Sequence, residues 1–216
     1  MYFDSRENKA KFIYYKFNKY FQESNSVLDI GCSDAWLATN LDRSAIDYAG
    51  LDIEVSELAR KNTSARGFSL TAVNLEKNKL PFNDNSFDMV VCTDVLEHIN
   101  HLHAVFNDII RVAKKYVIIS LPNMYVLSIR KKILRGQQIK FYNLPPTEPE
   151  DRHKWFFSYS DARNFIHSQK NVNVIEEFPY YDKRRGLKNL YGRIIERREL
   201  FPNFLSLSYW CLLEKN

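Results

Sequence analysis

SVLDIGCSDAW, residues Ser26–Trp36, is the stretch that decides the fold of this chain. The largely apolar run Val27–Ile30 predicts a short buried strand, and Gly31 predicts a tight turn directly after it. Residues Ala35–Leu41 then predict a helix. In the first crossover of an open α/β sheet, such a loop lies over the carboxyl ends of the strands, where ligands bind. The stretch therefore predicts an α/β fold and the place of its site.

The charges around this turn indicate which kind of ligand it accepts. A dinucleotide pyrophosphate needs several glycines for close approach and a helix N-terminus without competing negative charge. Asp29 and Asp34 flank the turn, so a pyrophosphate would be repelled. S-adenosylmethionine carries a sulfonium and an ammonium beside its carboxylate, and it can use both the aspartates and the helix N-terminal amides. We therefore expect a cationic nucleoside.

The same residues carry a resemblance to a known family. VLDIGCSDAWLA, residues 27–38, resembles the first motif of class I S-adenosylmethionine-dependent methyltransferases. The family usually has further glycines where this chain has Ser33 and Ala35, which are small enough for close approach. The resemblance implies a Rossmann-like, mostly parallel seven-stranded sheet with an antiparallel edge strand and helices on both faces. It also implies that Asp29, Gly31 and Ser33 bind the cofactor S-adenosyl-L-methionine.

Asp52 ends a second predicted strand, DYAGLD, residues 47–52. It follows Gly31 by 21 residues, close to the interval of about 20 at which a carboxylate binds the ribose of an adenosine ligand. One carboxylate can accept hydrogen bonds from both vicinal hydroxyls. The next residue, Ile53, is also expected at the cofactor. The alternative is that Asp52 is an ordinary strand-end residue that caps the helix predicted over residues 56–65.

Asn74 and Leu75 follow a third predicted strand, SLTAVN, residues 69–74. They fall where the family binds adenine, although the family more often has Asp at the first position. The Asn74 amide can accept from the adenine amino group, and the Leu75 main-chain N–H can donate to the ring. The alternative for Asn74 is a turn residue.

A second stretch, LPFNDNSFDMVVCTDVLEHI, residues 80–99, resembles the small-molecule branch of these methyltransferases. Its strand, residues 89–92, is the fourth predicted along the chain, and the order of the two motifs matches the family. Thr93, at the end of this strand, is expected at the cofactor. Nearly the whole chain, including residues 153–156, is also loosely similar to methyltransferase-like proteins near the MetW group.

The methyl acceptor would lie beyond the fourth strand, where Asp94, Glu97 and His98 share one face if the turn is helical. This DxxEH set is similar to the ExxEH cluster of ubiquinone-type O-methyltransferases and small-RNA 2′-O-methyltransferases, which holds a divalent metal. We expect a structural hydrogen-bonded pair here and no metal. The catalytic candidates are Asp94, His98 and His153, a candidate base in the proline-rich loop of residues 141–155. A solvated loop histidine is the alternative for His153.

The remaining pattern predicts a single methyltransferase domain over residues 1–216, without repeats. An N-terminal helix within residues 1–24 should cover the open side of the pocket. Residues 123–157 and 180–203 are expected to be inserted lid or basic segments, the second one helical across its basic run. The other expected elements are helices over 105–113, 124–134 and 160–167, the last capped by Ser160 and Asp161, and strands over 116–121, 172–178 and 207–213, the last two forming the antiparallel edge.

Composition supports a globular protein of the cytoplasm. At 216 residues, 45% of them apolar, the chain can bury a large core. It has no apolar run of about 18 residues, which a transmembrane helix needs, and its N-terminus lacks the apolar core of a signal peptide. Three scattered cysteines, Cys32, Cys92 and Cys211, indicate a reducing compartment.

The net charge of +5 is concentrated in two basic clusters, residues 130–140 and 183–198. Such an excess suits an anionic partner, and the alternative is a solvated helix face. We predict an S-adenosylmethionine-dependent methyltransferase that acts on a small or carrier-linked molecule at oxygen. An RNA methyltransferase is the alternative that the basic clusters favour. A catalytically inactive binding protein is the alternative that Ser33 and Ala35 favour.

Overall fold

The computed structural model describes residues 3–41, 46–147, 152–181 and 201–216. Its centre is one seven-stranded sheet in the order β3-β2-β1-β4-β5-β7-β6. The first five of these strands are parallel, and β7 runs antiparallel to both of its neighbours. The predicted Rossmann-like sheet and its antiparallel edge are confirmed. The strands are β1 (Ser26–Ile30), β2 (Asp47–Asp52), β3 (Ser69–Ala72), β4 (Phe87–Thr93), β5 (Ala113–Pro122), β6 (Val172–Tyr180) and β7 (Ser208–Lys215).

The strand order reverses between β1 and β4, which lie side by side although β2 and β3 come between them in the chain. The chain first moves outward from β1 through β2 to β3, and it then returns to the other side of β1. Loops that leave β1 and β4 therefore diverge and leave a crevice at the carboxyl ends of the strands. This is the place that the sequence predicts for the ligand.

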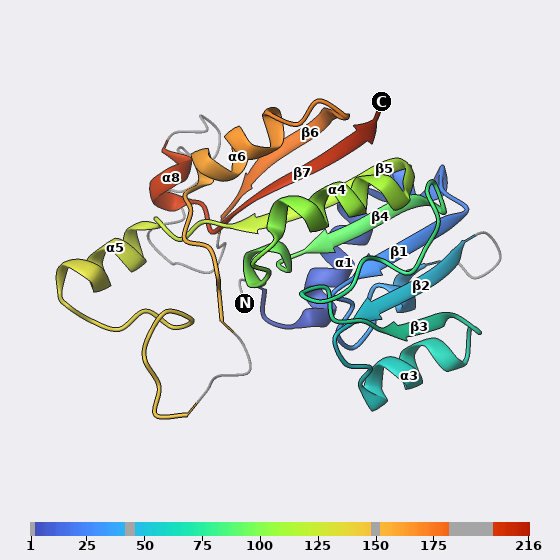
Figure 1. Ribbon diagram of the computed structural model, residues 1–216, viewed down its shortest axis with the longest axis horizontal. Coiled ribbons are helices and arrows are strands. Elements are labelled where there is room, and N and C mark those ends of the chain that lie inside the picture. The colour runs from blue at the N-terminus through green and yellow to red at the C-terminus, as the bar shows by residue number, and fades with distance from the viewer. Residues whose placement is uncertain (1–2, 42–45, 148–151, 182–200) are drawn as a thin grey trace.

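Helices cover both faces of the sheet, as Figure 1 shows, with α4 and α6 in front and α1 behind. On one face α4 and α6 pack onto the sheet through Phe106, Ile109 and Ile166, which are almost fully buried. On the other face α1, α2 and α3 pack through Ile13, Phe21 and Ala59. The helices are α1 (Arg6–Lys16), α2 (Asn18–Gln22), α3 (Glu57–Ser64), α4 (Leu102–Val112), α5 (Leu127–Leu134), α6 (Tyr159–His167) and α8 (Pro202–Leu205), with the 3-10 helices η1 (Ala38–Asn40) and η2 (Leu96–His98).

The N-terminal segment lies against the antiparallel edge of the sheet through a cluster of aromatic rings. Phe12 of α1 contacts Tyr180 of β6 and Trp210 of β7, with ring centroids 5.4 and 5.3 Å apart. The N-terminal helix predicted within residues 1–24 is interrupted at the fully buried Phe17, which ends α1 and precedes α2. These contacts hold α1 across the sheet, where it reaches the crevice.

The helix predicted over Ala35–Leu41 is wrong, because only the 3-10 turn η1 forms there. Ala35 has a φ of 53°, which a right-handed helix does not allow. The Trp36 carbonyl accepts from the Thr39 N–H, three residues on, and from the side-chain amide of Asn40, so the backbone pairs as in a 3-10 turn. The Arg66 guanidinium, which follows α3, donates to the carbonyls of residues 38, 39 and 41. Arg66 therefore satisfies carbonyls at the end of this segment, which a helix over Ala35–Leu41 would also have left unpaired.

Several predicted boundaries also shift. The cap of α6 is Ser158 and not Ser160, because Ser158 and Asp161 exchange hydrogen bonds in a capping box. The helix predicted from Met124 begins at Leu127, and β3 ends at Ala72. The described parts of the proline-rich loop, 141–147 and 152–155, contain no helix or strand, as predicted. The basic run 183–198 lies outside the described residues.

Replacing Arg66 with Ala should remove the three carbonyl hydrogen bonds and lower the free energy of unfolding by about 2–3 kcal/mol, since its donors are charged. Arg60 lies exposed on α3, so Arg60→Ala is the matched control and should change the free energy of unfolding by less than about 0.5 kcal/mol. Urea unfolding measures both values. Equal effects of the two substitutions would contradict the role assigned to Arg66.

Candidate functional site

A cleft of about 1460 Å³ opens at the carboxyl ends of β1, β2 and β4. Typical ligand pockets measure about 300–1,000 Å³, so this cleft has room for a nucleoside cofactor and a second molecule. The structure brings all the site residues predicted from the sequence to its wall. They are Asp29, Gly31, Ser33, Asp52, Ile53, Asn74, Leu75, Thr93, Asp94, His98 and His153.

Gly31 forms the bend that leaves β1. Its φ is +72°, and its N–H donates to the Leu51 carbonyl of β2 over 2.7 Å. A Cβ atom at this position would lie only 2.3 Å from Cγ2 of Val95. Both the left-handed backbone and the close approach of Val95 therefore require glycine here.

Ser33 and Ala35 occupy the positions where the resembling family usually has glycine. Their φ angles are 51° and 53°, so both are in the left-handed region that glycine adopts most easily. The chain thus keeps the backbone conformation of a glycine loop with small side chains, at a cost of roughly 1–2 kcal/mol for each residue. Both positions therefore have a glycine-like conformation although neither residue is glycine.

Asp52 connects the end of β2 to this loop. One carboxylate oxygen accepts from the Ser33 N–H and the other from the Ile53 N–H, each over 2.7 Å. The alternative that Asp52 caps the next helix is wrong, because Ser56 is the cap of α3 and accepts from the Ala59 N–H. Two backbone donors fix the carboxylate at the cleft, and Ile53 beside it is 67% exposed.

Asp29 and Asp34 differ in their surroundings. Burial raises the pKa of Asp29 to about 7, against the opposing effect of the Tyr48 hydroxyl, which donates to it over 2.9 Å. Asp34 pairs with Arg6 of α1 at 3.2 Å and accepts from Ser56. The negative charge expected on both sides of the turn is thus reduced at each aspartate, and Asp52 becomes the best-oriented carboxylate in the cleft.

Asn74 forms the turn after β3, which is the alternative that the sequence left open. Its side-chain oxygen accepts from the Glu76 N–H over 2.9 Å. A carbonyl oxygen has two lone pairs, so this contact leaves room for a second donor. Asn74 and Leu75 both line the cleft at the side that faces Ile53 and β2.

Asp94 is held by α1 and β5. Lys9 donates to its carboxylate over 2.9 Å and to the Thr93 carbonyl over 3.0 Å, and Ser120 donates to the same carboxylate. Burial opposes ionisation of Asp94, but these donors win and lower its pKa. Its φ of +56° places it outside the following helical turn. The predicted common face of Asp94, Glu97 and His98 is therefore wrong.

His98 instead lies beside Glu97 and His153. One ligand atom from each of these residues lies within 4.8 Å of the others. The rings of His98 and His153 are nearly perpendicular, with centroids 4.7 Å apart, and His153 stacks on Phe141 at 4.4 Å. His153 is buried, so its interpretation as a solvated loop histidine is wrong.

Sequence reasoning missed Lys9 and Phe141, which line the cleft, and the buried Tyr48, which donates to Asp29 behind its wall. Lys9 is one of several lysines in a helix, and no local pattern marks it. Tyr48 alternates with Gly50 on β2, and a Cβ atom at Gly50 would lie 3.1 Å from the Tyr48 hydroxyl. The pairing of a large residue with a glycine on one strand is the sequence signal that could have identified Tyr48.

Within the described parts of the chain, none of the helices has both the length and the apolar character that a membrane crossing requires.

Known proteins are similar to parts of this chain. MJ0638 of Methanocaldococcus jannaschii, an uncharacterized protein, is 39% identical over 89 residues, which are 41% of this chain and 36% of that protein. The ubiquinone biosynthesis O-methyltransferase of Vibrio cholerae is 26% identical over 183 residues, which are 81% of this chain and 74% of that enzyme. The chain spans only 36% and 27% of the lengths of the first curated relatives.

The fold also has solved neighbours. The crystal structure of magnesium protoporphyrin IX methyltransferase from Synechocystis PCC 6803 with bound SAH matches with a TM-score of 0.62 over 97% of this chain and 83% of that chain, at 14% identity. This likeness shows the methyltransferase fold. A family model described as methionine biosynthesis protein MetW matches residues 13–205.

Replacing Gly31 with Ala should lower the free energy of unfolding by about 2–4 kcal/mol. An alanine is strained in the left-handed conformation, and its Cβ would also clash with Val95. Gly67 has a similar φ of +65° with open space around it, so Gly67→Ala should show the strain alone, about 1–2 kcal/mol. Urea unfolding measures both.

A double substitution, Gly31→Ala with Val95→Ala, should recover part of the loss, because it removes the clashing methyl groups. If Gly31→Ala and Gly67→Ala cost the same, the close approach of Val95 does not constrain the bend.

Proposed function

The chain belongs to the MetW family, and from that premise we propose that it is an S-adenosylmethionine-dependent methyltransferase that acts on an oxygen atom of a small or carrier-linked molecule. The observation that carries the proposal is the Asp52 carboxylate, which two backbone N–H groups hold at the cleft beside the Gly31 bend. The remaining lone pairs of such a carboxylate can accept from both ribose hydroxyls of an adenosine.

The rest of the cofactor would then follow the walls of the cleft. Ile53, Asn74 and Leu75, which line the cleft, would hold the adenine. Gly31 and Ser33 would hold the methionine end, and Asp29 and Thr93 would bind its ammonium. The group would supply a methyl on a sulfonium leaving group, and His98 and His153 would act on the acceptor of that methyl.

Methyl transfer needs alignment more than it needs a strong catalyst. The acceptor oxygen attacks the methyl carbon in line with the sulfur, the carbon–sulfur bond breaks, and the hydroxyl proton leaves the acceptor. Good alignment alone can lower the barrier by roughly 7–11 kcal/mol. His98 and His153 are the residues that act on the acceptor. Asp94 acts as a positioning residue, because its ion pair with Lys9 holds α1 over the cleft.

Oxygen as the acceptor atom is supported by two observations. The histidines of the cleft can accept the proton that a hydroxyl loses. The Vibrio cholerae relative is named an O-methyltransferase.

The three cysteines are buried free thiols, which suits the reducing cytoplasm in which we place the protein.

A second candidate function is methylation of RNA. It is favoured by α5, which buries none of its residues and carries Arg130, Lys131 and Lys132. Figure 1 shows α5 projecting from the body of the protein, and Lys132 reaches the cleft. Phosphate contacts would make RNA affinity fall steeply with salt. RNA binding that is absent, or independent of salt, would rule this candidate out.

The third candidate is a binding protein without turnover. It was suggested by Ser33 and Ala35, which stand where the family usually has glycine. Both residues have the left-handed conformation that glycine adopts most easily, which argues against this candidate. An assay with radiolabelled cofactor and a panel of hydroxyl, thiol and amine acceptors distinguishes an active enzyme from this inactive protein. Cofactor binding with no methylated product across the panel would favour the inactive protein.

Replacing Asp52 with Asn should weaken S-adenosylmethionine binding about 10- to 100-fold, which corresponds to roughly 1–3 kcal/mol from charged hydrogen bonds. Asp47 lies exposed at the other end of the same strand, so Asp47→Asn is the matched control and should bind like the wild type. Isothermal titration calorimetry measures both. Wild-type protein that does not bind below millimolar concentration would refute the proposed cofactor.

Affinity for S-adenosylmethionine should fall as the pH is lowered from 8 to 6. Because burial raises the pKa of Asp29 to about 7, its carboxylate becomes protonated over this range and no longer attracts the ligand's ammonium. If only the ionised form binds, the loss approaches tenfold one pH unit below the pKa. Calorimetry at each pH tests this, and Asp29→Asn should bind weakly with no such slope. A slope that persists in Asp29→Asn would assign it to another group.

A further inference from the structure

Two segments that are distant in the sequence meet beside the acceptor end of the cleft. Glu97 and His98 come from η2, just after β4, and His153 comes from the segment that precedes α6. The Glu97 carboxylate lies 3.8 Å from Nε2 of His98. With one atom of His153, these atoms form a group whose members all lie within 4.8 Å of one another.

The hydrogen-bond partner of His98 fixes which of its nitrogens faces this group. Nδ1 of His98 lies 3.2 Å from the Arg152 carbonyl. A carbonyl can only accept, so Nδ1 carries the hydrogen and donates. In the neutral ring, Nε2 then presents its lone pair on the side of Glu97. A histidine that binds a metal is usually oriented in this way, with its second nitrogen donating to a carbonyl or carboxylate.

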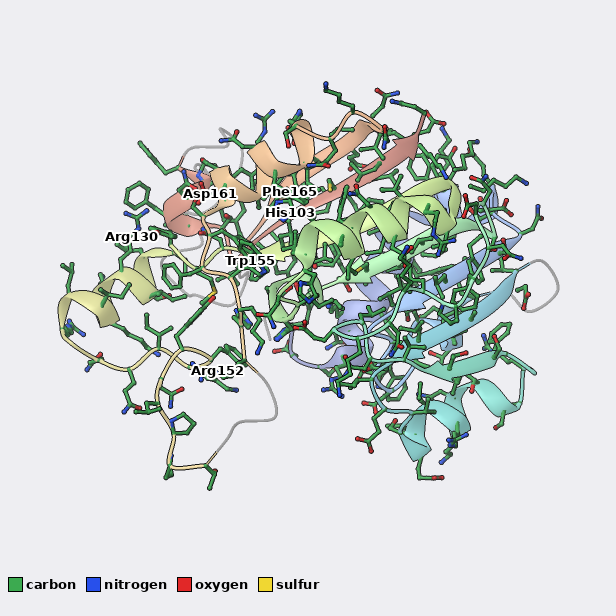
Figure 2. All side chains as sticks on the ribbon, viewed as in Figure 1. His103, Arg130, Arg152, Trp155, Asp161 and Phe165 are labelled. Carbon is green, nitrogen blue, oxygen red and sulfur yellow. The ribbon has the colours of Figure 1, made fainter. Side chains whose placement is uncertain are left out.

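The segment that carries His153 is attached to the η2 turn by two hydrogen bonds. The Lys154 N–H donates to the Glu97 carbonyl and the Trp155 indole to the Ile99 carbonyl, each over 2.7 Å. Figure 2 shows Arg152 and Trp155 along this segment, with the Trp155 side chain directed toward His103. His153 is also stacked on Phe141. The two histidines are thus positioned before any ligand arrives.

We propose that Glu97, His98 and His153 bind a divalent transition-metal ion at the acceptor end of the cleft. The Glu97 side chain is only 2% exposed, and a carboxylate withdrawn from water is stabilised by a cation that it can contact. Bond lengths to such an ion are about 2.0–2.2 Å, so neighbouring ligand atoms lie about 3 Å apart. The side chains need to approach one another by up to about 2 Å, which rotations about their χ angles can supply.

The ligand types predict which ions bind. Two imidazoles and one carboxylate suit Zn²⁺, Mn²⁺ or Fe²⁺, whereas Mg²⁺ and Ca²⁺ prefer oxygen ligands. Asp94 is not a ligand, because Lys9 and Ser120 hold its carboxylate. The site is therefore formed by Glu97 and both histidines, and not by the DxxEH set that the sequence indicated.

Three protein ligands leave open positions on the ion for oxygen atoms of the acceptor, a role that rests on the proposed function. A hydroxyl bound there loses its proton to water more easily, and its oxygen can attack the methyl group. With the ion bound, His98 and His153 would hold it instead of accepting the hydroxyl proton themselves, and water would take that proton. The acceptor class is a molecule that offers one or two adjacent oxygen ligands.

The ion site itself is tested without cofactor or acceptor. The full chain is treated with a chelator and dialysed, and Mn²⁺, Zn²⁺ and Mg²⁺ are titrated in turn by calorimetry. We expect one site for Mn²⁺ and Zn²⁺, with Mg²⁺ bound at least tenfold more weakly. Equal affinity for Mg²⁺, or no binding of Mn²⁺ and Zn²⁺, would overturn the proposal.

Glu97→Gln and His153→Ala should each weaken Mn²⁺ binding at least tenfold. His101→Ala is the matched control, because His101 is exposed near the same turn and outside the group. It should bind like the wild type, and a loss as large as that of His153→Ala would mean nonspecific binding. Circular dichroism checks that each variant is folded. Should Glu97→Gln fail to fold, Mn²⁺ electron paramagnetic resonance on wild type and His153→Ala decides, and identical spectra would overturn the proposal.

Cofactor titration keeps the two proposals separate. His153→Ala should lose Mn²⁺ binding and still bind S-adenosylmethionine within about threefold of the wild type. Wild-type protein that binds Mn²⁺ but no S-adenosylmethionine would refute the proposed cofactor and leave the ion site standing.

Discussion

A hydrogen bond from the Ser33 N–H to the Asp52 carboxylate holds the first loop of the sheet against the second strand. It depends on the left-handed bend at Gly31, which lets the chain turn back over β2, and on the close packing of Val95 at that bend. Because β1 also borders β4, the same bend sets where the acceptor end of the cleft lies. The proposed cofactor and acceptor sites are therefore positioned by one local geometry.

Features that depend on spacing along the chain could be predicted from the sequence. The bend at Gly31 and the position of Asp52 are separated by one strand, one connection and a second strand, so their distance in the chain sets their distance in space. The parallel sheet follows from the same alternation of strands and helices. The helix over Ala35–Leu41 could not be excluded in this way, because the left-handed conformation of Ala35 is not visible in a residue type that favours helices.

The proposed catalytic side of the cleft depends on contacts that no local pattern contains. Lys9 reaches Asp94 across 85 residues of chain, and that ion pair changes the role expected for the aspartate. His98 meets His153 only because the proline-rich loop returns to η2. Each histidine was a separate candidate in the sequence, and the structure makes them parts of one group with Glu97. Tertiary contacts, not residue identity, decided what these side chains can do.

The central claim is that this cleft binds an adenosine sulfonium cofactor over the Gly31 bend. The most direct measurement is an electron-density map of crystals soaked with S-adenosylhomocysteine and, separately, with a nicotinamide dinucleotide. We expect S-adenosylhomocysteine with its ribose hydroxyls on Asp52 and its sulfur facing His98 and His153, and no density for the dinucleotide. A dinucleotide seated over Gly31, or a cleft that side chains of the protein fill in both soaks, would contradict the claim.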